Sequence, residues 1–186
     1  MPTISQADCI RGNRLVLRNV LESDAEFILR LRLDPSKSRY ISPVENSLGK
    51  QVEWIENYRR GVGEAYFIIE SDEGPQGTVR LYDANGNSFS WGSWIVRAGA
   101  PSSIAIESAL IVYRFALTFL GFGEAHFNVD RENISVLSFH DRFGATRVGV
   151  DERQIFFHIG FSAIEKSMIR YRRFLPNGIS VSGGGL

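Results

Sequence analysis

One stretch of the chain, residues 91–144, restricts the possible fold more than any other. It reads as a β-strand, a turn of small residues, an apolar helix, another strand and a second helix opened by Asn133. The turn, residues 97–103, leads directly into the apolar helix, and backbone N–H groups at a helix N-terminus attract phosphate. This order of elements predicts an α/β fold with a pocket for a pyrophosphate-bearing cofactor.

The rest of the chain continues with strand and helix patterns. Ser23 is expected to cap the first helix, with Glu26 completing a capping box, and Asn85-Gly86 indicates a hairpin turn. Alternating or short apolar runs predict strands at residues 14–20, 65–70, 77–82, 88–96, 125–129, 146–150 and 154–159. Helical spacing predicts helices at residues 23–34, 51–60, 104–120, 133–143 and 162–174, with a loop at residues 35–50.

Length and composition predict one globular domain. The chain has 186 residues, of which 44% are hydrophobic and 23% charged, which is enough for one well-buried core. No repeat or linker divides it, so we expect a single domain over residues 1–175. The Gly-rich residues 176–186 are expected to form a disordered tail.

The charge balance and the few cysteine and histidine residues exclude several classes of protein. Lys+Arg and Asp+Glu both number 21, so we expect neither nucleic acid nor an anionic membrane as a partner. Cys9 is the single cysteine, and His126, His140 and His158 are scattered, so no metal site is expected. No apolar run approaches the roughly 20 residues of a membrane span, and no signal peptide is evident. We therefore expect a cytoplasmic protein.

The segment Asp130-Arg131-Glu132-Asn133-Ile134-Ser135-Val136-Leu137-Ser138-Phe139-His140-Asp141-Arg142-Phe143-Gly144 resembles a motif of the GNAT N-acetyltransferases. In that family Asn opens the helix and an aromatic-acid-base-apolar-Gly run ends it, and the resemblance covers roughly residues 14–161. It implies a mixed central sheet of about seven strands, splayed between the fourth and fifth, with four to five flanking helices. It also implies acetyl-CoA as co-substrate.

The resemblance implies a set of cofactor-binding residues. The pantetheine arm is expected along Trp94, Ile95 and Val96, as an added strand would lie. The turn should present Gly99, Ala100, Ser102 and Ser103 to the pyrophosphate, and Asn133 is expected to reach the arm. The usual Arg/Gln-x-x-Gly-x-Gly/Ala pattern is not clearly present, so an ordinary strand-to-helix connection and a plain N-cap stay as alternatives.

The resemblance also implies catalytic positions. Many members have a tyrosine acid seven residues after the helix-opening asparagine, and that position is His140 here, where an imidazolium could protonate the leaving thiolate. The alternative is a structural histidine. The backbone N–H of Ile95 is expected to polarise the thioester. Strand 88–94 carries no carboxylate, so Glu70 and Asp83 are the candidate bases, acting through water, unless they are ordinary strand-end charges.

The acceptor is expected to be the primary amine of a small molecule. The side chains of Trp54, Tyr58, Tyr82 and Trp91 are expected to line its pocket, with aromatic core packing as the alternative. The resemblance favours an amino-sugar nucleotide; the alternatives are ribosomal-protein N-terminal or antibiotic acetylation, or a catalytically silent binding module. Candidates for contacts to a diphosphate are Arg39, Arg59, Arg80 and the cluster Arg170 to Arg173.

A homodimer is also expected. The late hairpin at residues 155–159 and the helix carrying Tyr171 and Phe174 are rich in aromatic residues. One copy is expected to leave part of this apolar surface uncovered.

Overall fold

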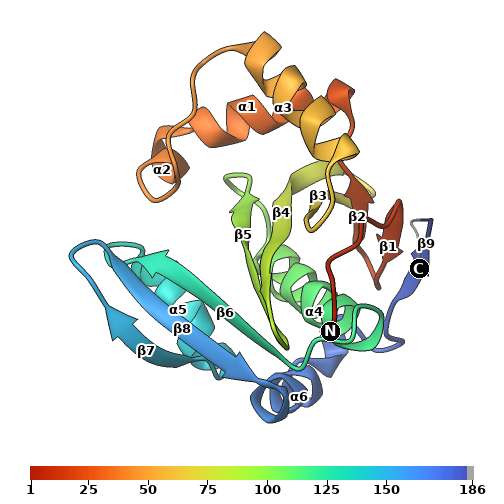
Figure 1. Ribbon diagram of the computed structural model, residues 1–186, viewed down its shortest axis with the longest axis vertical. Helices are drawn as coiled ribbons and strands as arrows, with labels where there is room; N and C mark the ends of the chain where they lie inside the picture. The colour runs from red at the N-terminus through yellow and green to blue at the C-terminus, as the bar shows by residue number, and fades with distance from the viewer. Residues whose placement is uncertain (184–186) are drawn as a thin grey trace.

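The computed structural model describes residues 1–183 and contains one nine-stranded sheet, ordered β7-β8-β6-β5-β4-β3-β2-β1-β9 (Figure 1). The strands are β1 (Cys9–Arg11), β2 (Val16–Asn19), β3 (Ala65–Ser71), β4 (Gly74–Asn85), β5 (Ser88–Val96), β6 (Glu124–Asp130), β7 (Thr146–Val150), β8 (Gln154–Gly160) and β9 (Ser180–Ser182).

Helices cover both faces of this sheet. They are α1 (Ala25–Leu33), α2 (Pro35–Ser38), α3 (Leu48–Arg60), α4 (Ser102–Thr118), α5 (Ile134–Phe143) and α6 (Phe161–Arg170), with the short 3-10 helices η1 (Glu22–Asp24) and η2 (Arg172–Phe174). The helices α1 and α3 pack on the face opposite α4 (Figure 1). No described helix is long and apolar enough to cross a membrane.

The sheet is split between its fourth and fifth predicted strands, β5 and β6. These two strands are the parallel pair of the sheet, and they are paired only at Ser88 with Glu124 and at Phe89 with Ala125. Beyond that point they diverge, and Figure 1 shows β6 leaning away from β5 to leave a V that opens toward α2. The predicted mixed, splayed sheet is therefore confirmed.

The main core lies between the sheet and α4. Apolar residues surround α4 on nearly all sides, as its sequence predicts, and Tyr113 and Phe115 are fully buried. One charged residue is buried with them: Glu107 Oε1 accepts hydrogen bonds from the backbone N–H groups of Asn13, Arg14 and Leu15 at 2.7 to 3.0 Å. Three donors satisfy this carboxylate, so it ties α4 to the β1–β2 turn.

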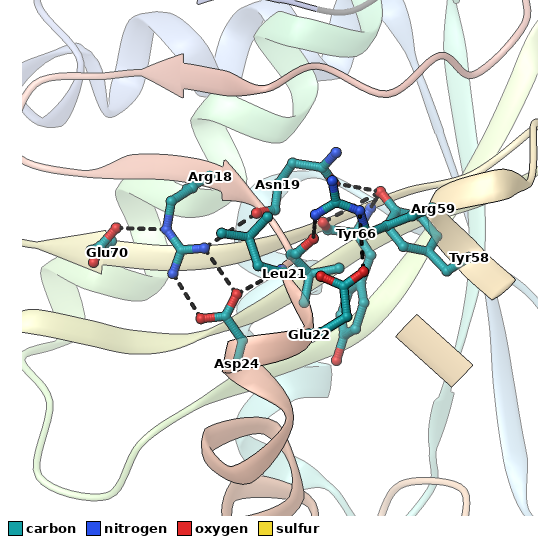
Figure 2. A network of polar contacts seen from close by, with 10 residues as sticks. Arg18, Asn19, Leu21, Glu22, Asp24, Tyr58, Arg59, Tyr66 and Glu70 are labelled. Atoms are coloured by element: carbon teal, nitrogen blue, oxygen red, sulfur yellow. Dashed lines mark hydrogen bonds and ion pairs between the residues drawn. The ribbon is translucent and has the colours of Figure 1, made fainter. Parts of the chain in front are cut away.

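A polar network fixes α1 and α3 to the sheet on the other face (Figure 2). The guanidinium of Arg18 donates two hydrogen bonds of 2.9 Å to Asp24, and these raise the pKa of Arg18. On the α3 side, the Tyr58 hydroxyl donates to Asn19 at 2.7 Å and accepts from the backbone N–H of Tyr66 at 2.8 Å. The helices above the V are thus held by bonds to β2 and β3.

Several sequence predictions need correction. Two short strands, β1 and β9, add to the seven predicted, and α2 lies inside the predicted loop. Residues 180–182 form β9, paired with β1, so that part of the predicted disordered tail is a strand, whereas residues 184–186 lie outside the described residues. Ser23 is not the cap of α1: it lies inside η1, and Asp24 accepts from the Leu21 N–H at 2.8 Å.

Other local predictions are confirmed. Asn133 caps α5 by accepting from the Val136 N–H, and Gly144 ends it in the left-handed conformation, with φ of 96°. The β4–β5 hairpin turns at Gly86, with φ of 59°, where the Asn-Gly signal predicted it. The single domain over residues 1–175 stays a prediction.

Candidate functional site

A β-bulge in β5 shapes the edge of the V. Thr78 pairs with Ile95 and Arg80 with Gly92, so two residues of β5, Ser93 and Trp94, oppose a single residue of β4. Ser93 has φ of 45°, and the Thr78 hydroxyl donates to its carbonyl at 2.7 Å. A bulge of this kind redirects the side chains that follow it.

The bulge places both tryptophans of β5 on the face toward α4. Trp91 Nε1 donates to the Tyr113 hydroxyl at 3.2 Å, and Trp94 Nε1 donates to Ser108 Oγ at 3.1 Å. In an unbroken strand residues three apart point to opposite faces. The extra residue therefore produces a continuous aromatic surface, in which the two indole rings lie 5.1 Å apart.

A cavity of about 860 Å³ passes through the V. Its walls are Arg32 and residues 40–43 above, Arg80 and Tyr82 of β4, residues 91–94 of β5, residues 127–130 of β6, Asn133, Val136 and His140 near α5, and residues 151–154 of the β7–β8 turn. Arg80 pairs with Tyr66, whose side chain packs under α1 and α3, whereas Trp91 packs with the α4 core. The cavity therefore has a polar front chamber below α1 and α2 and an aromatic back chamber between β5 and α5.

His140 lies in the back chamber, enclosed by aromatic rings. Its ring centroid is 4.3 to 6.0 Å from those of Phe127, Trp91, Phe139, Phe157 and Trp94. The residue is 4% exposed, and its Nδ1 is buried without a hydrogen-bond partner in the described structure. An unpaired buried nitrogen beside a cavity marks a position where a ligand could supply the partner.

The environment also fixes the charge of His140. Burial lowers its pKa to about 3, and nearby Asp141 opposes this effect only weakly. The imidazole is therefore neutral at pH 7. This low pKa does not favour the expected imidazolium acid, because five rings replace the water that would solvate the charge. The catalytic role of His140 stays a prediction.

Charged residues gather in the front chamber. Arg80 forms an ion pair with Glu64 at 2.5 Å and lies over the rings of Trp54 and Tyr82, each 5.2 Å from the guanidinium. Asp130, Asp151 and Glu152 line the opposite wall. Asp151 accepts from the N–H groups of Arg153 and Gln154, which lower its pKa, so its role includes closing the β7–β8 turn.

Some of the predicted site residues meet in the cavity. These are His140, Trp94, Asn133, Tyr82 and Trp91. The other predicted cofactor contacts, Ile95, Val96, Gly99, Ala100, Ser102 and Ser103, do not line it; they lie at the end of β5 and at the start of α4.

The two predicted bases lie elsewhere. Glu70 accepts a hydrogen bond from Arg18 Nε at 3.1 Å in the network of Figure 2, outside the cavity. Asp83 lies near the β4–β5 turn, with φ of 50°, where it pairs with His126 at 3.2 Å. Their role as bases stays a prediction, which these positions do not favour.

Two of the predicted acceptor residues also lie outside the cavity. Tyr58 lies in the last turn of α3 and is buried, which raises its pKa to about 12, and its hydroxyl is fully used in the network. Trp54 stacks on Tyr58 at 5.9 Å. For these two residues the alternative interpretation, aromatic packing, describes the structure better.

The cavity is lined by arginines that sequence analysis did not identify as candidates. Of the predicted diphosphate contacts only Arg80 lines it, whereas Arg39 pairs with Glu132 and Arg59 with Glu22. The residues that sequence reasoning missed include Arg32 and Arg153. Arg32 occupies the last turn of an amphipathic helix, a place where arginine is common, so the sequence offered no signal for it.

Comparison with known proteins agrees with this architecture. The Acetyltransferase (GNAT) domain family matches residues 14–146. Apo FdhC, a nucleotide-linked sugar GNAT, is 40% identical, with 89% of this chain and 97% of that chain covered and a TM-score of 0.79. A GCN5-related N-acetyltransferase from Brucella melitensis is 12% identical, with 94% and 89% covered and a TM-score of 0.78. A variant of the spermidine N-acetyltransferase SpeG from Vibrio cholerae is 19% identical, with 82% and 96% covered and a TM-score of 0.71. No curated protein matches the sequence. The chain belongs to the acetyltransferase (GNAT) family.

Proposed function

We propose that this acetyltransferase moves the acetyl group of acetyl-CoA to the primary amine of an amino-sugar nucleotide. The observation that carries the proposal is the cavity through the V, whose back chamber is aromatic and whose front chamber is charged. An apolar thioester arm suits the first chamber. In the second chamber the arginines Arg32, Arg80 and Arg153 would attract the anionic part of an acceptor, whereas the carboxylates of Asp130, Asp151 and Glu152 suit its amine. The 40% identity to a nucleotide-linked sugar GNAT supports this acceptor class.

The proposed donor position follows β5 and the start of α4. The pantetheine arm would lie along Trp94, Ile95 and Val96, where β6 has already diverged and leaves the strand edge open. The pyrophosphate would lie at residues 99–103, against the N-terminus of α4. Gly99 supports this position, because its φ is 77° and a Cβ there would meet no atom within 4 Å, so the backbone is open to a close ligand.

His140 would act as a neutral hydrogen-bond donor in this reaction. The acceptor nitrogen attacks the thioester carbon, negative charge develops on the carbonyl oxygen, and the carbon–sulfur bond then breaks to release thiolate. A neutral imidazole N–H can stabilise such charge without losing its proton, provided that the ring is held neutral. The buried, unpartnered ring of His140 fits this role. The proton of the acceptor amine would leave through water.

Two measurements test the proposed function. Acetyl-CoA at 100 times its dissociation constant should stabilise the folded chain by about 2.7 kcal/mol. Thiol release should then occur with a nucleotide-linked amino sugar, and the product should carry one added acetyl group. No thermal shift at millimolar acetyl-CoA contradicts the donor assignment, and a shift without turnover on any amine of a broad panel identifies a silent binding module.

A further inference from the structure

Arg32 is an arginine of the front chamber with no counter-charge. It lies in the last turn of α1 and lines the cavity together with residues 40–43. The ion pairs of the described residues include none to Arg32, whereas Arg80 on the same side is paired with Glu64. A partly buried cation without a carboxylate partner loses hydration and gains no opposite charge in return.

The hydrogen-bonding groups of Arg32 are also only partly used. Its Nη2 donates to the carbonyl of Ser42 at 2.9 Å, which orients the guanidinium. Its Nε is buried and has no acceptor in the described structure. Arg32 also acts on the Tyr66 hydroxyl, where its hydrogen bond and charge lower the pKa against the larger, raising effect of burial. Because Nε is buried, an oxyanion would be bound through the terminal Nη groups of the guanidinium, which can present two N–H groups at once.

The position of Arg32 indicates how the acceptor would be oriented in the cavity. Figure 1 shows α1 and α2 above the open end of the V, whereas His140 lies on α5 in the back chamber of the same cavity. On the proposed function, the acceptor amine must reach the thioester in the V. The anionic part of the acceptor would then extend upward, toward α1.

We propose that Arg32 binds the diphosphate of the nucleotide-linked acceptor and is the residue that selects nucleotide-linked over free amino sugars. This inference rests on the proposed function. In this arrangement the phosphates bind below α1, at one end of the cavity, and the amino sugar lies between Arg32 and the V. Residues 40–43 then form the wall beside the phosphates.

Binding of a nucleoside diphosphate is the first test. UDP and dTDP are titrated by calorimetry into protein saturated with acetyl-CoA, so that phosphate sites used by the donor are already filled. At least one of them should bind the wild type, and Arg32→Gln should weaken it by about tenfold or more. The matched control is Arg30→Gln, which removes the same charge from the same helix at an exposed side chain paired with Glu26.

Kinetics provide the second test. Arg32→Gln should raise KM for the nucleotide-linked amino sugar, leave kcat at saturation nearly unchanged, and leave KM for acetyl-CoA and for the free amino sugar unchanged. If Arg32→Gln fails to fold, Arg32→Lys is used, since it keeps the charge but loses the two-pronged contact. A folded Arg32 variant with wild-type nucleotide affinity and wild-type KM overturns the inference, as does absence of UDP and dTDP binding to the wild type.

The outcomes also separate this inference from the proposed function. If Arg32→Gln acetylates a nucleotide-linked amino sugar with the same KM as the wild type, the proposed function holds and the proposed role of Arg32 is wrong. Arg32-dependent binding of UDP or dTDP without acetyl transfer to any nucleotide-linked amine keeps the phosphate site and contradicts the function.

Discussion

His140 is enclosed by five aromatic rings, and this burial determines which chemistry its imidazole can perform. A ring with a pKa of about 3 carries one N–H and one lone pair at pH 7, so it can donate a hydrogen bond but holds no extra proton to release. On the proposed function, His140 would therefore stabilise the oxyanion and would not act as the general acid. That distinction can be measured.

The first prediction concerns the rate of acetyl transfer. His140→Phe should lower the single-turnover rate by about 10²-fold, because it removes a hydrogen bond that strengthens only as charge develops in the transition state. Affinity for acetyl-CoA should be nearly intact, and His140→Gln, which keeps an N–H donor, should recover part of the rate. The pH profile should be the same in wild type and variants. If the wild-type rate instead requires the protonated form of a group, and this pH dependence is absent from His140→Phe, then His140 acts as an imidazolium acid.

The same residue should make the fold sensitive to acid. The pKa of His140 is lowered on folding, so below its usual value of about 6.5 the unfolded chain binds a proton that the folded chain does not. Stability is therefore lost as pH falls from about 6.5 toward 3. Between pH 7 and pH 5 the wild type should lose about 2 kcal/mol more of its unfolding free energy than His140→Phe does. Urea unfolding at both pH values measures this difference, and equal losses would mean that the buried ring is protonated.

Sequence reasoning located His140 but not its charge state. Its position follows from the spacing to Asn133, which is a local feature. Its pKa depends on rings contributed by β5, β6 and β8 as well as by its own helix. Arg32 was missed for the same reason, because nothing in its local sequence shows that it faces a cavity instead of solvent.

At the scale of elements, β5 and the start of α4 form the proposed donor surface. The bulge at Ser93 and Trp94 needs close contact between β4 and β5, and a Cβ on Gly77 would lie 2.2 Å from the Ile95 carbonyl oxygen. The absence of a side chain at Gly77 therefore permits the close approach of β4 and β5 beside the bulge. The adjoining turn around Gly99 is the part that would contact the phosphates.

The next prediction concerns acetyl-CoA binding at the turn of residues 97–103, called the donor turn here. Gly99→Pro should weaken acetyl-CoA binding, because proline cannot adopt the φ of 77° found there, and Ser103→Glu should weaken it by roughly tenfold through repulsion of phosphate. Ser162→Glu, at the start of α6, places the same charge at another helix N-terminus and serves as control. Calorimetric titration of acetyl-CoA measures the affinity of each variant. If both donor-turn variants bind acetyl-CoA as tightly as the wild type does, the pyrophosphate binds elsewhere.

Long, strongly patterned elements were predictable and short ones were not. The apolar α4, the Asn133-to-Gly144 helix and the Asn-Gly hairpin all carry local signals that match the structure. The three-residue strands β1 and β9 have too few positions for a pattern, and each exists because the other pairs with it. The bulge was equally hidden, since it depends on the register between two strands.

For the molecule as a whole, the split sheet would separate the proposed donor side from the proposed acceptor side. Apolar residues expected to form a dimer surface, Phe157 and Ile159, are buried within the chain, while Phe156 and Val150 are exposed. A homodimer therefore stays a prediction and no longer rests on the whole hairpin. The cavity walls named above all belong to described residues of a single chain.

The most direct test of the account compares acceptors in one experiment. With saturating acetyl-CoA, kcat/KM is measured for a nucleotide-linked amino sugar, for the same amino sugar without its nucleotide, and for spermidine, and each product is weighed by mass spectrometry. We expect a single acetyl group on the nucleotide-linked amine, with kcat/KM at least about tenfold above that of the free sugar, because the front chamber is proposed to bind the diphosphate. Equal values for linked and free sugars, or preferred acetylation of spermidine, would contradict it.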